Sequence, residues 1–266
     1  MDGWGFWVAG VIAAALVGAG KGGIPIVGML GVPVLALVIP PGIAAGLLLP
    51  VYVVSDMFGL WAYRRDYDAR VLAIALPGAM AGIAVGWATA SVVPEAAVRV
   101  LIGLIGLVFA LNLLLRRGVV AKPQKARVAP GLFWGGVTGF TSFVSHSGAP
   151  PWQVYTLPLG LSRSVFAGTS TIAFAVINAA KLLPYWQLGL LGTANLRAAA
   201  VLAVPACISV FAGVWLVKHL PEERFFQLVV WALLLISIKL IWDGTVVLLG
   251  RICGGAEISA LRRNHP

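Results

Sequence analysis

The sequence predicts an all-α, polytopic membrane protein built from two inverted repeats, each with a broken, re-entrant-like helix pair and three transmembrane helices. Composition, long apolar segments and an internal repeat support this prediction. Of the 266 residues, 60% are hydrophobic and only 11% are charged, and the mean hydropathy is +0.97. Since a soluble domain carries about 25% charged residues, this composition excludes a soluble globular protein and a disordered chain.

The net charge of +10 does not by itself indicate a nucleic-acid partner. The 19 Lys and Arg residues are spread over short loops between apolar segments, which is the distribution found in membrane proteins. The two cysteines, Cys207 and Cys253, stand in no CxxC or Cys/His spacing. We therefore expect contact with membrane lipid, no nucleic acid, no metal and no cofactor.

Ten apolar segments follow one another along the chain. Six approach or exceed the ~20 residues that a helix needs to cross a bilayer, namely 42–63, 71–90, 96–115, 164–183, 196–217 and 225–249. Four are short or interrupted and form two pairs, 4–20 with 25–39 and 131–144 with 150–161. Leu- and Ala-rich stretches without period-2 alternation indicate helices. A small, Gly-containing break joins each pair, so we expect two helices that meet near the middle of the membrane.

The two broken pairs begin two similar halves. Gly46, Asp56, Tyr63 and Pro77 are matched by Gly168, Asn178, Tyr185 and Pro205, and Pro94-Glu95 is matched by Pro221-Glu222. The offset stays between 122 and 128. We therefore divide the chain into a first transmembrane repeat, a basic cytoplasmic linker, a second repeat and a C-terminal tail, at 1–115, 116–130, 131–250 and 251–266.

Lys and Arg counts predict the orientation. The loop 64–70 holds three Arg, the loop 116–127 holds five basic residues and the loop 218–224 holds two, whereas the turn 91–95 holds only an acidic residue. Basic loops stay in the cytoplasm, so we expect a multi-pass protein of the cell membrane with the turn 91–95 outside. Three crossings per half invert the second half relative to the first. Basic residues after 250 would then lie outside, so one crossing more or fewer remains an alternative.

Lys21 lies in the first break, and a charge inside the membrane usually has a function. Gly22 and Gly23 allow a sharp reversal of the chain with accessible backbone amides. Pro25 suits the first turn of a helix, whose free N–H groups attract anions. The alternative is that Lys21 extends to the membrane surface and the glycines only allow close packing.

The second break contains Ser145, His146, Ser147 and Gly148, and a helix begins at the prolines that follow. Hydroxyl groups and an imidazole can bind an oxyanion or move a proton, and the amide region near Gln153 should face the same gap. If the halves are related by pseudo-symmetry, the two breaks meet at one central site. The alternative for His146 is a hydrogen-bonded structural role.

Asp56 is the carboxylate placed deepest in an apolar segment. It could take up and release a proton, as could His146, or it could pair with Lys21. The alternative is that it contacts Arg64 and Arg65, about two helical turns away. Its repeat partner Asn178 is neutral, so any proton coupling would be asymmetric.

Other polar and aromatic residues receive structural predictions. The hydroxyls of 169–171 are expected to bond to their own helix. Lys181, Lys239 and Asp243 are expected to extend to the surface or to pair. Trp152 and Tyr155 could line the site or only pack. An interfacial aromatic belt would comprise Trp4, Trp7, Trp61, Tyr63, Tyr185, Trp186 and Trp242.

An enzyme is not expected, and no catalytic residue is predicted. Ser147-Gly148 is similar to part of the serine motif of intramembrane proteases, but Ser145 stands where GxSG requires Gly. The sequence contains no HExxH, GxGD or P-loop motif.

Both breaks resemble signatures of the sulfite exporter family (TauE/SafE type). The first is Gly18-Ala-Gly-Lys-Gly-Gly23 with Pro33, and the second is Gly139-Phe-Thr-Ser-Phe-Val-Ser-His-Ser-Gly-Ala-Pro-Pro151. Asn178 with Lys181 and Tyr185 fits one branch. Many members have a GGGG run in the first break, from which Lys21 and Ile24 depart, so the size and charge preference of the site can differ.

The resemblance implies a secondary transporter, and an exporter in particular, for sulfite or a related sulfur-containing anion such as an organosulfonate. The residues themselves indicate only an anion site, at which the two repeats would give alternating access. The alternatives are transport of another small organic anion and a non-transport role as an intramembrane enzyme. The sequence leaves a homo-oligomer open.

Overall fold

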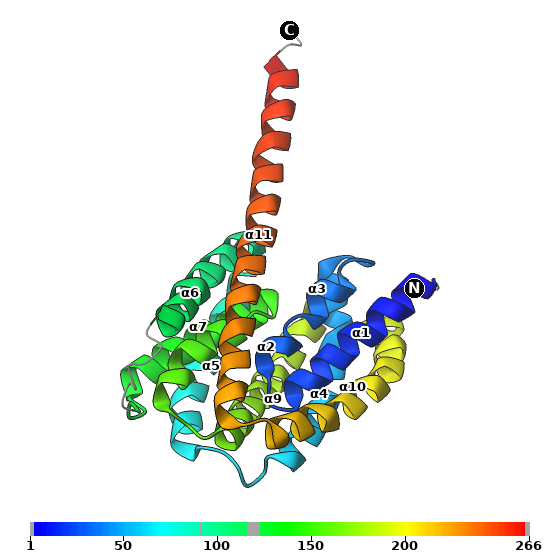
Figure 1. The fold of residues 1–266 in the computed structure, drawn as a ribbon. Coiled ribbons are helices and arrows are strands. Elements are labelled where there is room, and N and C mark those ends of the chain that lie inside the picture. The colour runs from blue at the N-terminus through cyan, green and yellow to red at the C-terminus, as the bar shows by residue number, and fades with distance from the viewer. Residues whose placement is uncertain (1–2, 91, 116–122, 264–266) are drawn as a thin grey trace.

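The computed structural model describes residues 3–90, 92–115 and 123–263 (Figure 1). All regular elements in this part of the chain are helical. They are α1 (Trp4–Lys21), α2 (Pro25–Gly28), α3 (Gly31–Leu35), α4 (Pro41–Ala62), α5 (Ala69–Ala88), α6 (Glu95–Leu115), α7 (Val128–Ser145), α8 (Ala149–Thr156), the short 3-10 helix η1 (Leu157–Leu159), α9 (Arg163–Gln187), α10 (Thr193–His219) and α11 (Glu222–Arg263).

Seven of these helices are long and apolar enough to cross a membrane, namely α1, α4, α5, α6, α9, α10 and α11. The prediction of an all-α, polytopic membrane protein is therefore confirmed. We expected the segment of α1 to be too short to cross. It meets this criterion because the helix extends through Lys21 to 18 residues.

Both predicted helix breaks are present. The chain leaves α1 through Gly22 and Gly23 and re-enters a helix at Pro25. Gly23 has a positive φ of 117°, a conformation that favours glycine. Figure 1 shows α1 entering the bundle from the N-terminus and α2 and α3 returning toward the same edge. The segment 25–39 is not one helix, because Pro33 lacks the N–H that would bond to the carbonyl of residue 29.

The second break is at His146, a left-handed residue with φ 53° that ends α7. Pro150 then lies in the first turn of α8, where its missing N–H costs no helical bond. The break is therefore a sharp reversal between two helices, as in the first half of the chain.

Helix packing follows a paired arrangement. The closest associations are α5 with α7, α1 with α10 and α6 with α11, and α4 packs against α9. Small residues allow these backbones to touch. A Cβ at Gly18 in α1 would lie 1.9 Å from the carbonyl oxygen of Ala206 in α10, and one at Gly139 in α7 would lie 2.0 Å from that of Ala79 in α5.

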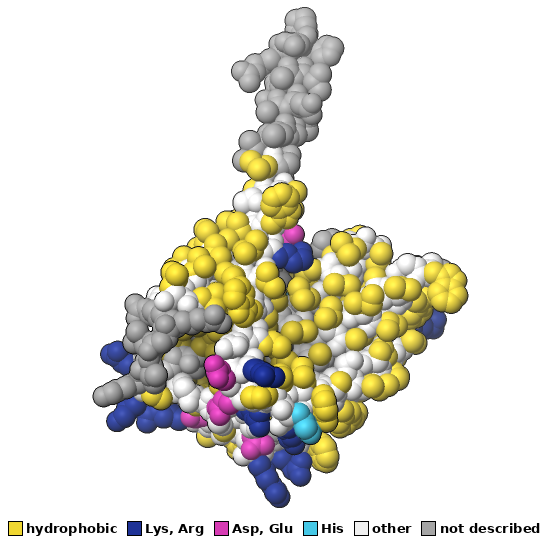
Figure 2. Space-filling view, viewed as in Figure 1, with side chains coloured by type: hydrophobic (Ala, Val, Ile, Leu, Met, Phe, Trp, Pro, Cys, Tyr) yellow, Lys and Arg dark blue, Asp and Glu magenta, His cyan; other side chains and the backbone are white. Residues whose placement is uncertain are grey.

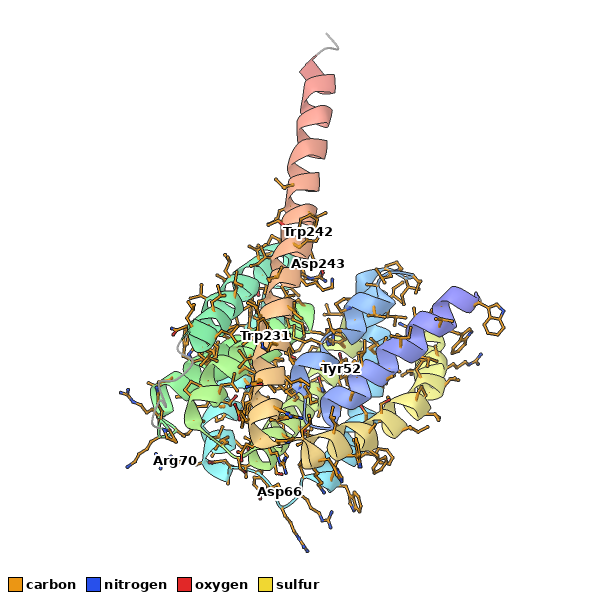
Figure 3. All side chains as sticks on the ribbon, viewed as in Figure 1. Tyr52, Asp66, Arg70, Trp231, Trp242 and Asp243 are labelled. Atoms are coloured by element: carbon orange, nitrogen blue, oxygen red, sulfur yellow. The ribbon has the colours of Figure 1, made fainter. Side chains whose placement is uncertain are left out.

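Basic side chains gather at one end of the molecule (Figure 2), where the loop between α4 and α5 lies (Figure 1). Figure 3 places Asp66 and Arg70 near this end, Trp242 and Asp243 toward the other end, and Tyr52 between them. This distribution agrees with the expected orientation. Residues 116–122 of the predicted basic linker lie outside the described residues. The backbone of the predicted tail continues α11 to Arg263.

The predicted aromatic belt agrees with the structure only in part. Trp4, Trp61, Trp186 and Trp242 are exposed, as side chains at a membrane interface would be. Tyr63 and Tyr185 are instead buried, and their hydroxyls donate to the carbonyl of Gly22 in the first break and to that of Phe143 in the last turn of α7.

Candidate anion-binding site between the two helix breaks

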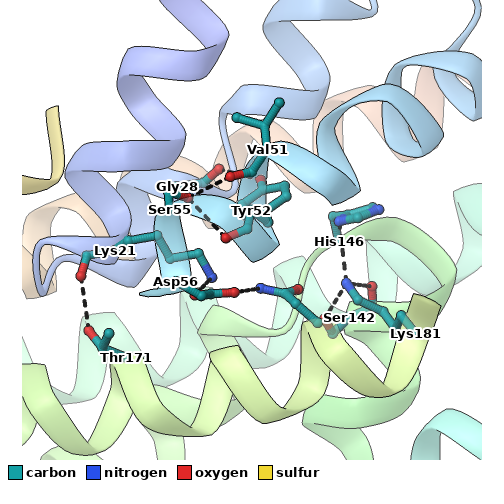
Figure 4. Close-up of polar contacts among 11 residues, drawn as sticks. Lys21, Gly28, Val51, Tyr52, Ser55, Asp56, Ser142, His146, Thr171 and Lys181 are labelled. Atoms are coloured by element: carbon teal, nitrogen blue, oxygen red, sulfur yellow. Dashed lines mark hydrogen bonds and ion pairs between the residues drawn. The ribbon is translucent and has the colours of Figure 1, made fainter. Parts of the chain in front are cut away.

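Lys21 and Asp56 form a buried ion pair at the first break (Figure 4). Lys21 Nζ lies 2.7 Å from Asp56 Oδ1, and Asn178 Nδ2 donates to Asp56 Oδ2 at 3.0 Å. Asp56 is 1% exposed. The pairing of Asp56 with Lys21 is therefore confirmed, whereas Arg64, the alternative partner, donates to the backbone carbonyl of Trp61. Lys21 does not reach the surface.

Lys181 is the second buried cation of the site, with a side chain that is 0% exposed. Its Nζ contacts the carbonyl oxygen of Ser142 at 3.2 Å, Ser142 Oγ at 3.1 Å and His146 Nδ1 at 3.4 Å. The expectation that Lys181 extends to the surface or pairs with an acid was wrong. The reason is that α9 continues to Gln187, so Lys181 lies within the helix and faces α7.

His146 is held by contacts on several sides. Its ring stacks on Tyr52 with centroids 5.7 Å apart, and its Nε2 lies 2.9 Å from the hydroxyl oxygen of Tyr185. Tyr185 donates its own proton to the carbonyl of Phe143 at 3.1 Å. All contacts are satisfied when Nε2 carries the ring proton and donates to Tyr185, while Nδ1 accepts from Lys181. A neutral imidazole fits this network.

A cavity of about 40 Å³ lies between the two breaks. By the ~10–15 Å³ that one water requires, it holds about three waters or one small ion. Its polar lining comprises Lys21, Tyr52, Ser142, His146, Thr171, Asn178 and Lys181. Thr171 Oγ1 also donates to the carbonyl of Lys21 at 3.1 Å, which joins the first break to α9.

The other predicted site residues lie beside this cavity rather than in its lining. Ser145 Oγ donates to the carbonyl of Thr141, and Ser147 Oγ donates to that of Ser145. Gly22 packs against the backbone of Gly213. Three further predicted residues, each near a helix end or on α8, are not lining residues of this cavity: Gly23, Gly148 and Gln153.

The expected free amides are also partly occupied. The N–H of Trp152 donates to the carbonyl of Gly148, and that of Val27 donates to Ile24. Trp152 Nε1 donates to Ser170 Oγ, and Tyr155 OH donates to the carbonyl of Arg127, so both rings pack rather than line the cavity. Side chains contribute more to this cavity than helix ends do.

Hydroxyl groups on α9 and the charged pair on α11 have separate roles. Ser170 bonds to its own helix, as expected, but Thr169 accepts from the backbone N–H of Asp68 and Thr171 contacts the first break. Lys239 and Asp243 form the ion pair that their four-residue spacing allows.

A second cavity of about 200 Å³ lies on the other side of His146. Its lining includes Glu95, Ser145, His146, Tyr185 and Leu188. Glu95 belongs to the turn that we expect outside the cell. His146 lines both cavities, so it is shared by the central cavity and this outer one.

Sequence reasoning missed the contributions of Tyr52, Ser142 and Lys181 to the central cavity. One signal was present: Lys181 follows Asn178 by three residues, which places both on one face of a helix. Because Asn178 corresponds to Asp56 in the internal repeat, that face of the helix would be expected to point toward the central site. Ser142 and Tyr52 carried no comparable signal in the sequence.

Fold and site together define a multi-pass membrane protein with a small cavity, lined by two lysines, between two broken helix pairs. The family model Sulfite exporter TauE/SafE matches residues 5–240. The chain therefore belongs to this transporter family and is a multi-pass protein of the plasma membrane. No curated protein and no solved structure matches the chain.

Proposed function

We propose that this chain is a secondary transporter that exports sulfite, or a related small sulfur-containing anion, by alternating access at the central cavity. The observation that carries the proposal is the cavity itself. It lies between the two breaks, it is large enough for a small ion, and its lining includes two lysines, of which Lys21 pairs with Asp56. Family membership supplies the substrate class, and the site supplies a positive charge for it.

Two inverted repeats are supported by equivalent contacts in the two halves. Tyr63 OH donates to the carbonyl of Gly22 at 2.5 Å, and its counterpart Tyr185 donates to that of Phe143 at 3.1 Å. Both bonds tie the end of a long helix to the break of the same half. Packing of α1 on α10 likewise corresponds to packing of α7 on α5. Asp56 and its counterpart Asn178 contact each other directly, as residues near a pseudo-twofold axis would.

Alternating access would open the central cavity to one side at a time. His146 is shared by this cavity and the outer one, so its displacement would connect them. Movement of the break at Gly22 and Gly23 would open the opposite path. The membrane potential, positive outside, favours the exit of an anion, so export needs no coupling ion.

Asp56 and His146 are the proposed groups for proton coupling if transport is driven inward. Protonation of Asp56 would release Lys21 from its ion pair and leave the lysine free to face an anion. The predicted binding residues Lys21, Gly22, Gly23, Ser145, Ser147, Gly148 and Gln153 would then shape the cavity and its two entrances as the breaks rearrange.

The test is the flux of radiolabelled sulfite in proteoliposomes, with and without a pH gradient, against empty liposomes. We expect sulfite to move at a rate that depends on the membrane potential. A panel with an organosulfonate and a carboxylate distinguishes sulfur-containing anions from other small organic anions. Absence of flux for every sulfur-containing anion would contradict the proposal.

A further inference from the structure

The charges around the central cavity are unequally paired. Lys21 has a carboxylate partner, because Asp56 Oδ1 lies 2.7 Å from its Nζ. Lys181 contacts only a carbonyl, a hydroxyl and an imidazole, all neutral acceptors. Among the described ion pairs, none includes Lys181. The cavity therefore faces one cation whose charge is balanced and one whose charge is not.

An unbalanced charge of this kind needs a counter-ion. A fully buried ammonium loses its hydration, and neutral hydrogen-bond acceptors replace only part of that stabilisation. Lys181 is 0% exposed, yet its side chain lines the cavity. A small anion in the cavity would lie within reach of this ammonium and would complete a second ion pair beside the first.

We propose that Lys181 is the residue that binds the transported anion, that Lys21 is held by Asp56 and does not pair with it, and that the site accepts a small, singly charged oxyanion. This inference rests on the proposed function and specifies its substrate class. One unbalanced lysine matches one negative charge. A doubly charged anion of the same size would bring a second charge into a cavity of about 40 Å³, and the described residues that line it include no second unpaired cation.

Two neutral donors complete the site. Asn178 lies beside Lys181 on the same face of α9 and lines the cavity, as does Ser142. The Asn178 amide donates to Asp56 through one of its two hydrogens, which leaves the other for a ligand. These groups can donate to oxygen atoms of an oxyanion without adding charge. They do not distinguish sulfur from another central atom, so the selectivity we infer concerns charge and size.

The decisive comparison removes the unbalanced cation in one set of variants and the balanced ion pair in another. Lys181→Gln and Lys181→Met remove the unbalanced charge, and Lys181→Gln keeps a polar group near Ser142. The double variant Lys21→Gln/Asp56→Asn removes the balanced pair and leaves Lys181 alone. Binding of sulfite to the purified full chain in detergent is measured for each by calorimetry or by the rise in unfolding temperature with sulfite concentration. The pH is kept below the second ionisation of sulfurous acid, so that the singly charged hydrogensulfite predominates.

We expect the two Lys181 variants to bind sulfite about tenfold to hundredfold more weakly, which is the usual effect of losing a charged hydrogen bond. The double variant should lose less affinity than either Lys181 variant, because it removes a neutralised ion pair and leaves the unpaired cation in place. Unfolding without sulfite controls for misfolding: Lys181→Met should unfold no earlier than the native chain, because it removes an unbalanced buried charge. Lys181→Gln provides the measurement if Lys181→Met does not fold.

Methanesulfonate and sulfate test the charge preference, since both are tetrahedral and similar in size but carry one and two charges. Methanesulfonate should compete with sulfite and sulfate should not. Native-like binding by both Lys181 variants, equal loss in the double variant, or better competition by sulfate would each overturn the inference. Failure of the native chain to bind or transport any sulfur-containing anion would instead overturn the proposed function.

Discussion

At the residue scale, the central cavity is governed by charge balance. Asp56 is nearly inaccessible, so its carboxylate depends on Lys21 and Asn178 for stabilisation. The ion pair joins the first break to α4, and the amide joins α4 to α9. The same contacts that stabilise the carboxylate therefore hold the two halves together at the site.

Lys21→Gln alone should destabilise the protein strongly, because it leaves the Asp56 carboxylate buried without a cation. We expect a loss of about 3–5 kcal/mol, as for other broken buried pairs. Adding Asp56→Asn should restore most of this loss. Thermal unfolding in detergent measures both variants. Equal stability of the single and double variants would show that the buried Asp56 carboxylate does not depend on Lys21 for its stabilisation.

Tyr63→Phe and Tyr185→Phe should each cost about 1–3 kcal/mol, because each leaves a buried carbonyl of a break without its hydroxyl donor. Tyr185→Phe should also alter transport, since His146 Nε2 loses its partner. The control is Tyr67→Phe, whose ring is exposed in the loop before α5. Loss of stability in this control as large as in the other two would contradict the assigned role of the break carbonyls.

At the element scale, the close approach of α1 to α10 and of α7 to α5 sets the positions of both breaks. Each approach depends on glycine. Much of this layer was predictable, since the long helices and both breaks follow from apolar runs and from Gly and Pro positions. The scarcity of charge left the Lys21–Asp56 pair as one of several alternatives for Asp56. The three-dimensional contacts of Lys181 and Ser142 were not, because local pattern does not reveal which neighbouring helix a side chain faces.

Gly18→Ala should destabilise the α1–α10 contact, because its Cβ would lie 1.9 Å from the carbonyl oxygen of Ala206. We expect a loss of at least about 1–3 kcal/mol, typical of overpacking. Gly5→Ala in the same helix is the matched control, since nothing lies within 4 Å of its added Cβ. Thermal unfolding should show a decrease only for Gly18→Ala. A decrease of equal size at Gly5 would contradict the contact explanation, because Ala favours a helix more than Gly does and the added Cβ meets nothing there.

At the scale of the whole molecule, the basic end is the side that we expect in the cytoplasm, and the turn that carries Glu95, beside the outer cavity, is the side that we expect outside. The central cavity lies between them, and His146 is shared by it and the outer cavity. This arrangement suits a protein whose two repeats expose one site alternately. The proposed direction of transport follows from charge, because an anion leaves the cell down the membrane potential.

Cysteine accessibility tests the sidedness. In a background with Cys207→Ser and Cys253→Ser, single cysteines replace Tyr67 in the basic loop and Val92 in the turn before α6, both exposed positions. In intact cells an impermeant maleimide should label position 92 and not position 67, and in inverted vesicles the pattern should reverse. Labelling of both positions from one side would contradict the orientation.

The most direct test of the central claim is the efflux of radiolabelled sulfite from proteoliposomes that contain the native chain, Lys181→Met or Lys21→Gln/Asp56→Asn. We predict efflux by the native chain that increases when the potential is positive outside, loss of most efflux in Lys181→Met, and a smaller loss of efflux in the double variant. Native-like efflux by Lys181→Met would contradict the central role of this cavity in anion transport.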